Sequence, residues 1–163
     1  MPITPFHFGP AALLKYAVPR HFSFFVFFVS QVYMDLEPYY FLVRGEYPEH
    51  RLFHTWLGCH IPLLAAALSG PPLYRLAVRL WKRAVPPVAI RPRCAFASAA
   101  IGAYSHVLLD GLMHADMRPF FPFSDRNPML NAIDVVLLHA LCVLCAMLAA
   151  ALYFRSHSGR RRA

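Results

Sequence analysis

Four long apolar stretches, separated by polar or proline-rich segments, dominate the sequence. They cover about residues 21–42, 52–69, 94–114 and 129–154. An α-helix needs about 20 mostly apolar residues to cross the hydrocarbon core of a bilayer, so each stretch is close to the length of a membrane span. The pattern predicts an all-α integral membrane bundle of about four transmembrane helices.

The segment between the second and third stretches has a different pattern. The Ser-Gly-Pro-Pro run at residues 69–72 is a strong helix stop, so we expect the second span to end there. In residues 73–87, apolar residues alternate with Arg and Lys at helical spacing. This spacing is typical of an amphipathic helix that lies on the membrane surface.

Composition supports a membrane location for the whole chain. Of its 163 residues, 58% are hydrophobic and 15% are charged, whereas charged residues make up roughly 25% of an average soluble domain. Four spans and their loops use nearly the whole length, which leaves no room for an additional soluble domain of ordinary size. We therefore expect residues 1–163 to form a single transmembrane helical domain.

The basic residues predict how the helices are oriented. Most of them fall on one side of a four-span topology, namely Lys15, Arg20, Arg75, Arg79, Lys82, Arg83, Arg91, Arg93, Arg155, Arg160, Arg161 and Arg162. The positive-inside rule makes this side, with the C-terminus, cytoplasmic. All eight acidic residues fall toward the outer face. Because topology explains the net charge of +8, the chain is not expected to bind nucleic acid.

Histidines gather on the acidic face. His50 and His54 are four residues apart, and His106 and Asp110 repeat this i, i+4 spacing, so each pair points the same way if its segment is helical. Further side chains expected at the same depth are Asp35, Glu37, His114 and Asp116. Three predicted helices therefore present imidazole and carboxylate groups at one level of the membrane.

This combination of groups favours a metal site. Ionisable groups inside a span cost about 2.5 to 3.5 kcal/mol each on insertion scales, so they usually face the bundle interior as paired or liganding groups. Neutral imidazole and carboxylate suit zinc and other divalent first-row metals. A single histidine more often caps or packs, and we interpret His60, His139 and His157 in that way. The convergence of the remaining groups predicts a divalent metal site or a proton relay.

Several short motifs occur in an order and spacing that resemble a known family. They are TPFHFGPA at residues 4–11, DLE at 35–37, HRLFHTWLG at 50–58, SHVLLDGLMHAD at 105–116 and PFSDRNP at 122–128. Together they resemble the small bacterial inner-membrane proteins described as membrane-bound metal-dependent hydrolases. The resemblance implies a bacterial inner-membrane location and a divalent metal cofactor.

Two details refine this resemblance. The HxxxD pattern of His106 and Asp110 is similar to a motif of helical zinc-dependent phospholipases C, which implies a phosphodiester substrate. Pro38 stands where relatives often carry a further histidine, so the number of metal ions stays open.

The resemblance also implies that His7 belongs to the site. The simplest topology places the N-terminus in the cytoplasm, a membrane thickness away from the other ligands. As an alternative, residues 8–17 could form a helix about 15 Å long. That helix would run inward to a turn at Pro19 and Arg20, and the resulting re-entrant hairpin would bring His7 toward the outer face.

We therefore expect a metal-dependent hydrolase that cleaves an ester or phosphodiester of an amphiphilic, lipid-like substrate at the outer face of the inner membrane. Its candidate metal ligands are His7, Asp35, His50, His54, His106, Asp110 and His114. Glu37 or Asp116 is the candidate general base that takes a proton from metal-bound water. Glu37, at a helix end, could instead orient a ligating histidine.

Two other classes of function stay open. A b-type cytochrome could use His54 and His106 as axial haem ligands, although the neighbouring carboxylates argue against it. A transporter or a non-catalytic metal-binding protein could use the same residues, but the sequence shows no inverted repeat.

Overall fold

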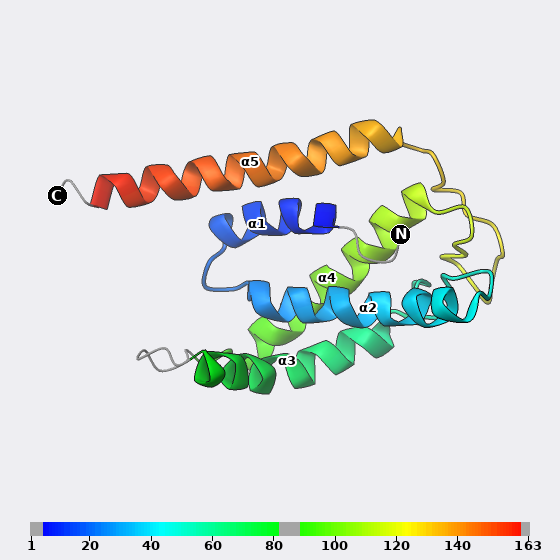
Figure 1. The fold of residues 1–163 in the computed structure, drawn as a ribbon, viewed down its shortest axis with the longest axis horizontal. Coiled ribbons are helices and arrows are strands. Elements are labelled where there is room, and N and C mark those ends of the chain that lie inside the picture. The colour runs from blue at the N-terminus through cyan, green and yellow to red at the C-terminus, as the bar shows by residue number, and fades with distance from the viewer. Residues whose placement is uncertain (1–4, 82–88, 161–163) are drawn as a thin grey trace.

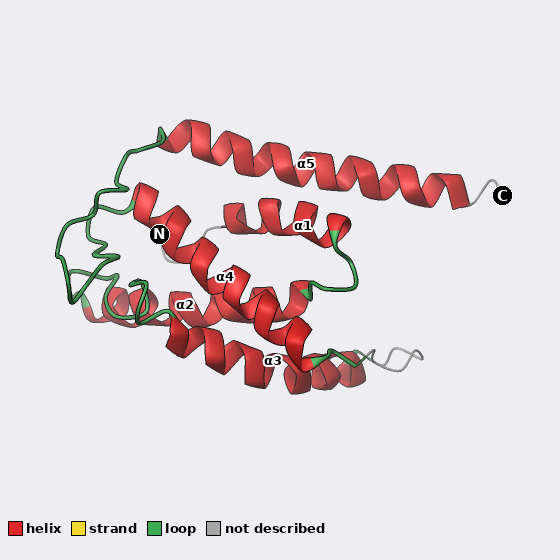
Figure 2. Ribbon diagram, turned by 180° about the vertical axis from the view of Figure 1, so that it is seen from behind, coloured by secondary structure: helices red, strands yellow, loops and turns green. Residues whose placement is uncertain are grey.

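The computed structural model describes residues 5–81 and 89–160 and is all-helical in these ranges. A short 3-10 helix, η1, precedes five α-helices (Figure 1). Their bounds are η1 Pro5–His7, α1 Phe8–Ala17, α2 Phe24–Arg44, α3 His60–Leu80, α4 Pro92–Met113 and α5 Val135–Arg160. No strand occurs in the described ranges (Figure 2). The all-α prediction is confirmed.

In the described part of the chain, three helices are long and apolar enough to cross a membrane. They are α3, α4 and the Val135–Ser156 part of α5. The predicted first span corresponds to α2, which contains the buried polar residues Gln31 and Asp35 and is not one of these three helices. The structure therefore supports a membrane protein, while the predicted count of four spans is not confirmed.

The second predicted span is placed differently in the structure. Helix α3 begins at His60 instead of residue 52, continues through Pro71 and Pro72, and ends at Leu80. The predicted helix stop at residues 69–72 is therefore wrong. Residues 73–80 belong to α3 and do not form the separate amphipathic helix that the sequence predicts. Residues 82–88 lie outside the described part of the chain.

Packing against α2 explains why α3 continues past its prolines. Gly70 lies so close to Val26 that an added side-chain carbon would be 3.0 Å from it. One turn later, the Tyr74 ring lies 5.5 Å from the Phe25 ring. These contacts keep the chain helical where local propensity would end the helix. The axis of α3 changes direction part-way along its length (Figure 1), as expected where prolines interrupt the backbone hydrogen bonds.

The short N-terminal helix is present, and with the next helix it forms a hairpin. Helix α1 covers residues 8–17 as predicted, and a turn then leads into α2, which runs back antiparallel to it (Figure 1). On its other side α1 packs on α5. A side-chain carbon at Gly9 would collide with the carbonyl oxygen of Cys142, so glycine allows this close approach. The hairpin places His7 at the same end as the loops that follow α2 and α4.

Helices α2 and α4 also approach closely. Small residues on α4, Ala95, Ala99 and Ala103, form a fully buried stripe. Gly102 lies beside them, and a side-chain carbon there would collide with the Ser30 hydroxyl of α2. This contact fixes α2 against α4 one turn before the first acidic residue of α2.

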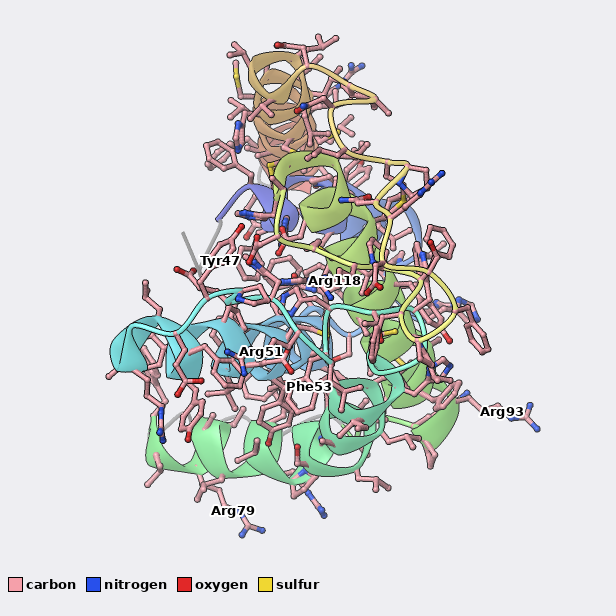
Figure 3. The ribbon with its side chains drawn as sticks, turned by 90° about the vertical axis from the view of Figure 1, so that its right-hand side faces the viewer. Tyr47, Arg51, Phe53, Arg79, Arg93 and Arg118 are labelled. Atoms are coloured by element: carbon pink, nitrogen blue, oxygen red, sulfur yellow. The ribbon has the colours of Figure 1, made fainter. Side chains whose placement is uncertain are left out.

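The bundle has two different ends. The loops at residues 45–59 and 114–134 lie at one end, and the end of α3, the start of α4 and the end of α5 lie at the other (Figure 1). Figure 3 looks onto the loop end, where Tyr47, Arg51, Phe53 and Arg118 are labelled. Arg79 and Arg93 project at the margin of that view, from helices that extend away from the loops. The acidic residues and the basic helix ends are thus separated along the bundle, as the sequence predicts.

Candidate metal centre

The nine predicted site residues meet at the loop end of the bundle. Five parts of the chain supply them: η1 gives His7, α2 gives Asp35 and Glu37, the loop at 45–59 gives His50 and His54, α4 gives His106 and Asp110, and the segment after α4 gives His114 and Asp116. Each residue is joined to another of the set by an N–O distance of at most 3.7 Å or by a ring contact. The sequence therefore predicts the membership of one spatial cluster, while the metal-binding roles stay predictions.

Asp110 lies at the middle of this cluster. Its Oδ1 atom is 3.2 Å from His7 Nε2. Its Oδ2 atom is 3.1 Å from His106 Nε2 and 3.7 Å from His54 Nε2. Asp35 adds a second carboxylate, with Oδ1 3.5 Å from His106 Nε2. Three histidine nitrogens and two carboxylates thus face one another in a buried space.

Gln31 of α2 fixes two of these histidines and was missed by the sequence analysis. Its Oε1 atom is 3.1 Å from His7 Nδ1 and 2.8 Å from His106 Nδ1. Its amide nitrogen donates to the carbonyl oxygen of Gly102 at 2.9 Å, which turns Oε1 toward the two rings. The signal that could have identified it is a glutamine one helical turn before Asp35, inside a mostly apolar run.

The hydrogen bonds determine which ring nitrogens carry protons. An amide oxygen only accepts hydrogen bonds, so Nδ1 of both His7 and His106 must be the donor. In the neutral imidazole, Nε2 then presents a lone pair. Both Nε2 lone pairs face carboxylate oxygens of Asp110, an arrangement that is repulsive unless a positive charge lies between them.

The loop histidines follow the same rule. His54 Nδ1 lies 3.3 Å from Glu37 Oε2, and His50 Nδ1 lies 2.9 Å from Asp116 Oδ2. An ionised carboxylate can only accept, so each Nδ1 donates and each Nε2 is left free. In proteins, a histidine that binds a metal usually donates its other ring N–H to a carboxylate, an amide or a carbonyl oxygen in this way.

Four buried atoms lack a hydrogen-bond partner among the described residues. They are Nε2 of His7, His54 and His106, and Oδ1 of Asp110. Leaving a buried polar atom without a partner costs about 1–3 kcal/mol, and these four atoms all belong to one cluster. Neutral imidazole and carboxylate oxygen are also the ligands that zinc and related divalent ions prefer. The residues present therefore fit a divalent cation.

Glu37 and Asp116 are placed behind the histidines. Glu37 accepts hydrogen bonds from the backbone N–H groups of Arg51 and Phe53, at 3.1 and 2.9 Å. Asp116 accepts from the backbone N–H groups of Glu49 and His50, at 3.0 and 3.1 Å. These bonds hold the loop in an irregular path, so His50 and His54 do not share a helix as their spacing predicts. The sequence allows two roles for Glu37, a general base or a residue that orients a ligating histidine. Its contacts fit the second role.

The protonation states of the loop residues suit metal binding. Burial lowers the pKa of His54 and of His114, which keeps both rings neutral at physiological pH. Burial opposes ionisation of Asp116, but hydrogen bonds from the His50 ring and backbone hold the pKa of this carboxyl well below its usual range. Asp116 is therefore a weak proton acceptor and a strong hydrogen-bond acceptor.

Among the described residues, the candidate metal-ligand atoms form three overlapping sets. In each set, one ligand atom from every member lies within 4.8 Å of the others. The sets are His7 with His106 and Asp110, Asp35 with His54 and His106, and His50 with Asp110 and His114. The first two sets are fully buried, whereas His114 in the third is partly exposed.

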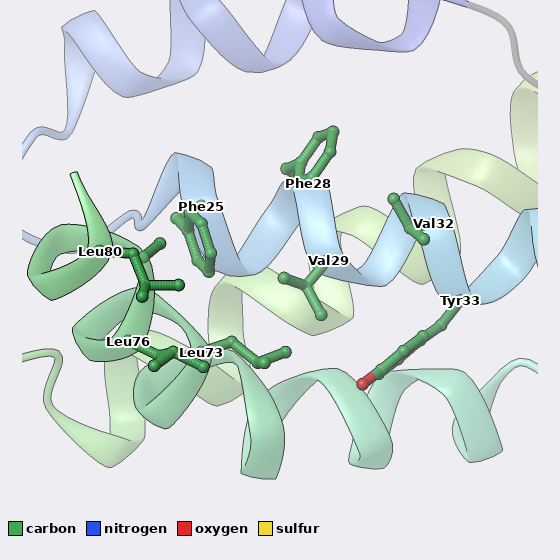
Figure 4. A pocket seen from close by; sticks show the side chains of 9 residues that line it. Phe25, Phe28, Val29, Val32, Tyr33, Leu73, Leu76 and Leu80 are labelled. Carbon is green, nitrogen blue, oxygen red and sulfur yellow. The ribbon is translucent and has the colours of Figure 1, made fainter.

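A polar cavity adjoins the third set. It has a volume of about 330 Å³ and is lined by the two loops, including Tyr47, Asp116 and Arg118. Figure 3 shows Tyr47 and Arg118 at the loop end of the bundle. A second, apolar groove of about 340 Å³ lies between α2 and α3 (Figure 4). Phe25 and Leu80 line that groove, so it extends to the opposite end of both helices.

Two of the histidines interpreted as structural, His60 and His139, lie outside the cluster. Both ring nitrogens of His60 are engaged, at 2.9 Å from the carbonyl oxygen of Leu57 and 3.0 Å from the Tyr104 hydroxyl. The His139 ring packs on Phe6 at 4.1 Å. The side chain of His157 lies outside the described part of the structure.

Comparison of the chain with protein-family models, with curated proteins and with solved structures gives no match.

Proposed function

We propose that the protein is a membrane-bound hydrolase whose activity depends on a divalent metal, with zinc as the expected ion. One observation carries the proposal: Nε2 of His7, His54 and His106 and Oδ1 of Asp110 are buried together without hydrogen bonds, while hydrogen bonds hold Nδ1 of each ring. Nitrogen and oxygen atoms arranged in this way are preorganised to bind a cation.

The chemistry follows from this donor set. When bound, a divalent ion would lower the pKa of a coordinated water to about 7 and stabilise negative charge on the substrate. The protein's own residues would fix the geometry. Gln31 and Glu37 orient three of the histidines, and Asp110 supplies negative charge at the centre. Asp116 orients His50 beside the polar cavity, through which water and substrate would reach the centre.

The surroundings support an amphiphilic substrate. The polar cavity lies at the loop end of helices long enough to span a bilayer, so its opening would lie near the membrane surface. A substrate with a polar head and an apolar tail could place its ester or phosphodiester group in that cavity. With the basic helix ends in the cytoplasm of a bacterial cell, the whole chain would form one domain of the inner membrane with its centre toward the outer face.

The geometry disfavours the haem alternative. The His54 and His106 rings lie 5.1 Å apart, and Asp110 Oδ2 contacts Nε2 of both. A carboxylate therefore occupies the position between the two nitrogens where a haem iron would have to lie.

Metal analysis combined with an activity assay tests the proposal. Purified protein should contain a divalent metal and should cleave a member of a panel of amphiphilic esters and phosphodiesters. His106→Ala and Asp110→Ala should each lose metal and activity while still inserting into the membrane, because each removes a central ligand and lowers the insertion cost. His139→Ala is the matched control and should keep both properties. Metal-free wild-type protein, or equal metal loss in all three variants, would contradict the proposal.

A further inference from the structure

The three donor sets correspond to two positions for a cation. The set of His7, His106 and Asp110 and the set of Asp35, His54 and His106 both use His106. Its Nδ1 is bound to Gln31, so His106 has one free lone pair and can bind only one ion. These two sets therefore describe a single buried position.

The third set describes a different position. It contains His50 and His114 but not His106, and shares only Asp110 with the buried sets. The His50 and His114 rings lie 4.3 Å apart, and His50 Nδ1 is held by Asp116, which leaves its Nε2 free. A carboxylate has two oxygen atoms, so Asp110 can contribute to both positions at once.

We propose that the site holds two divalent cations with Asp110 as their common ligand. This inference deepens the proposed function and rests on it. The inner ion is held by His7, His106 and Asp110, with His54 and Asp35 beside it. The outer ion is held by His50, His114 and Asp110.

Charge balance supports two ions. Four carboxylates, Asp35, Glu37, Asp110 and Asp116, surround the cluster, each with a side chain no more than 12% exposed. Within residues 5–81 and 89–160, their ion pairs are all with histidines, and none is with Lys or Arg. Buried negative charge is costly unless it is compensated. With neutral histidines, two divalent ions balance four carboxylates, whereas one ion leaves two negative charges.

The two positions differ in their access to water. His7, His54 and His106 are no more than 4% exposed, so the inner ion is enclosed. His114 is partly exposed, and its neighbours Ala115 and Asp116 line the polar cavity. An ion held by His50, His114 and Asp110 would therefore be accessible to water and to substrate, and two ions together would stabilise the attacking and leaving oxygens.

The experiment is a count of bound metal in the full-length protein. Detergent-purified protein is loaded with Co²⁺, dialysed, and analysed for cobalt per chain. The wild type should hold two ions. His114→Ala should hold one, because the inner ligands remain, and His139→Ala should hold two. Asp110→Asn should lose both ions or bind them with at least tenfold lower affinity.

The possible outcomes separate this inference from the proposed function. A wild-type count of one, or an unchanged count of two in His114→Ala, would overturn the two-ion arrangement and leave the metal-dependent hydrolase standing. A count of zero would overturn both the two-ion arrangement and the metal-dependent hydrolase. EPR of the Co²⁺-loaded wild type gives a second measurement that needs no variant. Magnetic coupling between the ions is expected, and two uncoupled signals would exclude a shared ligand.

Discussion

Gln31 is a single amide that serves two imidazoles. Its oxygen accepts from Nδ1 of His7 and of His106, and its nitrogen is anchored on the Gly102 carbonyl. The residue contacts no cation position itself, yet it determines which nitrogen of each ring is free. A change here should affect metal affinity without removing any ligand.

Gln31→Leu should therefore weaken metal binding by about 10- to 100-fold, the usual effect of removing a hydrogen-bond partner of a ligating histidine. The measurement is a competition between the protein and a metal-sensitive chelator. Val32→Ala, at an exposed position of the same helix, is the control and should bind metal like the wild type. Wild-type affinity in Gln31→Leu would show that the amide does not orient the two rings.

Glu37→Gln separates the orienting role from the general-base role. Glu37 accepts from two backbone N–H groups and from His54, whereas glutamine has only one accepting oxygen. Loss of orientation predicts metal affinity about 10- to 100-fold weaker. A general base would instead leave affinity unchanged while kcat falls by about 10²- to 10⁴-fold. We expect the first result, measured by metal titration beside activity.

Glu46→Gln is the matched control for this experiment. Glu46 pairs with Arg44 and Arg51 at the surface, so its substitution should leave metal affinity and kcat unchanged. Full affinity and full activity in Glu37→Gln would contradict both roles.

The sequence predicts the chemistry of the site better than its local structure. Spacing and residue type identify eight of the nine clustered residues, because buried imidazoles and carboxylates are costly and must meet one another. The ninth, His7, is implied only by the resemblance to the hydrolase family. The i, i+4 spacing of His50 and His54 suggests a helix, but long-range hydrogen bonds from Glu37 and Asp116 fold that segment into a loop. Gln31 could not be identified from its type alone, since its role depends on contacts with residues 24 and 75 positions away.

At the scale of the helices, the packing of α2 on α4 determines the position of Gln31. Gly102→Ala would place a methyl group against the Ser30 hydroxyl. Overpacking of this kind costs about 1–3 kcal/mol, so the variant should lose its folded, monodisperse form at a lower temperature in detergent. The same displacement should weaken metal binding, because the Gly102 carbonyl anchors Gln31.

A second substitution tests this explanation. Ser30→Ala removes the colliding oxygen, so the Ser30→Ala/Gly102→Ala pair should recover part of the lost thermal stability. Leu108→Ala, on an exposed part of α4, should change stability little. A double variant no more stable than Gly102→Ala would show that the collision is not the cause.

Helix boundaries show where local sequence and tertiary packing compete. The start of α5 at Val135 follows from Asp134, whose side chain accepts a hydrogen bond from the Leu137 N–H at 3.0 Å as a helix cap. The end of α3 could not be predicted in this way. Its prolines favour a stop, but packing of Gly70 and Tyr74 on α2 outweighs that local preference.

At the scale of the whole molecule, the separation of charge predicts the topology. The residue at position 160, near the end of α5, should be cytoplasmic, and the loop at residues 45–59 should face outward. In intact cells, a membrane-impermeant thiol reagent should label Leu52→Cys but label Arg160→Cys only after the membrane is opened. The unmodified chain is the control, because it reports labelling of the four native cysteines. Labelling of position 160 from outside would invert the orientation and move the centre to the cytoplasmic face.

The all-helical architecture follows from the length of the apolar stretches, whereas the path of the N-terminus does not. Charge alone allows either a cytoplasmic N-terminus or a hairpin. The choice depends on close packing of Gly9 on Cys142, a contact between residues at opposite ends of the chain.

The position of His7 also has a consequence for the biogenesis of the protein. Asp110 is made about a hundred residues after His7, and helices α1, α2 and α3 are made between them. At translation speeds of about 5–20 residues per second, several seconds separate the two. During that time the histidine has none of its final neighbours from α4. The nascent chain thus brings these residues together only after α4 has been made, and under the proposed function a metal would be bound only after that point.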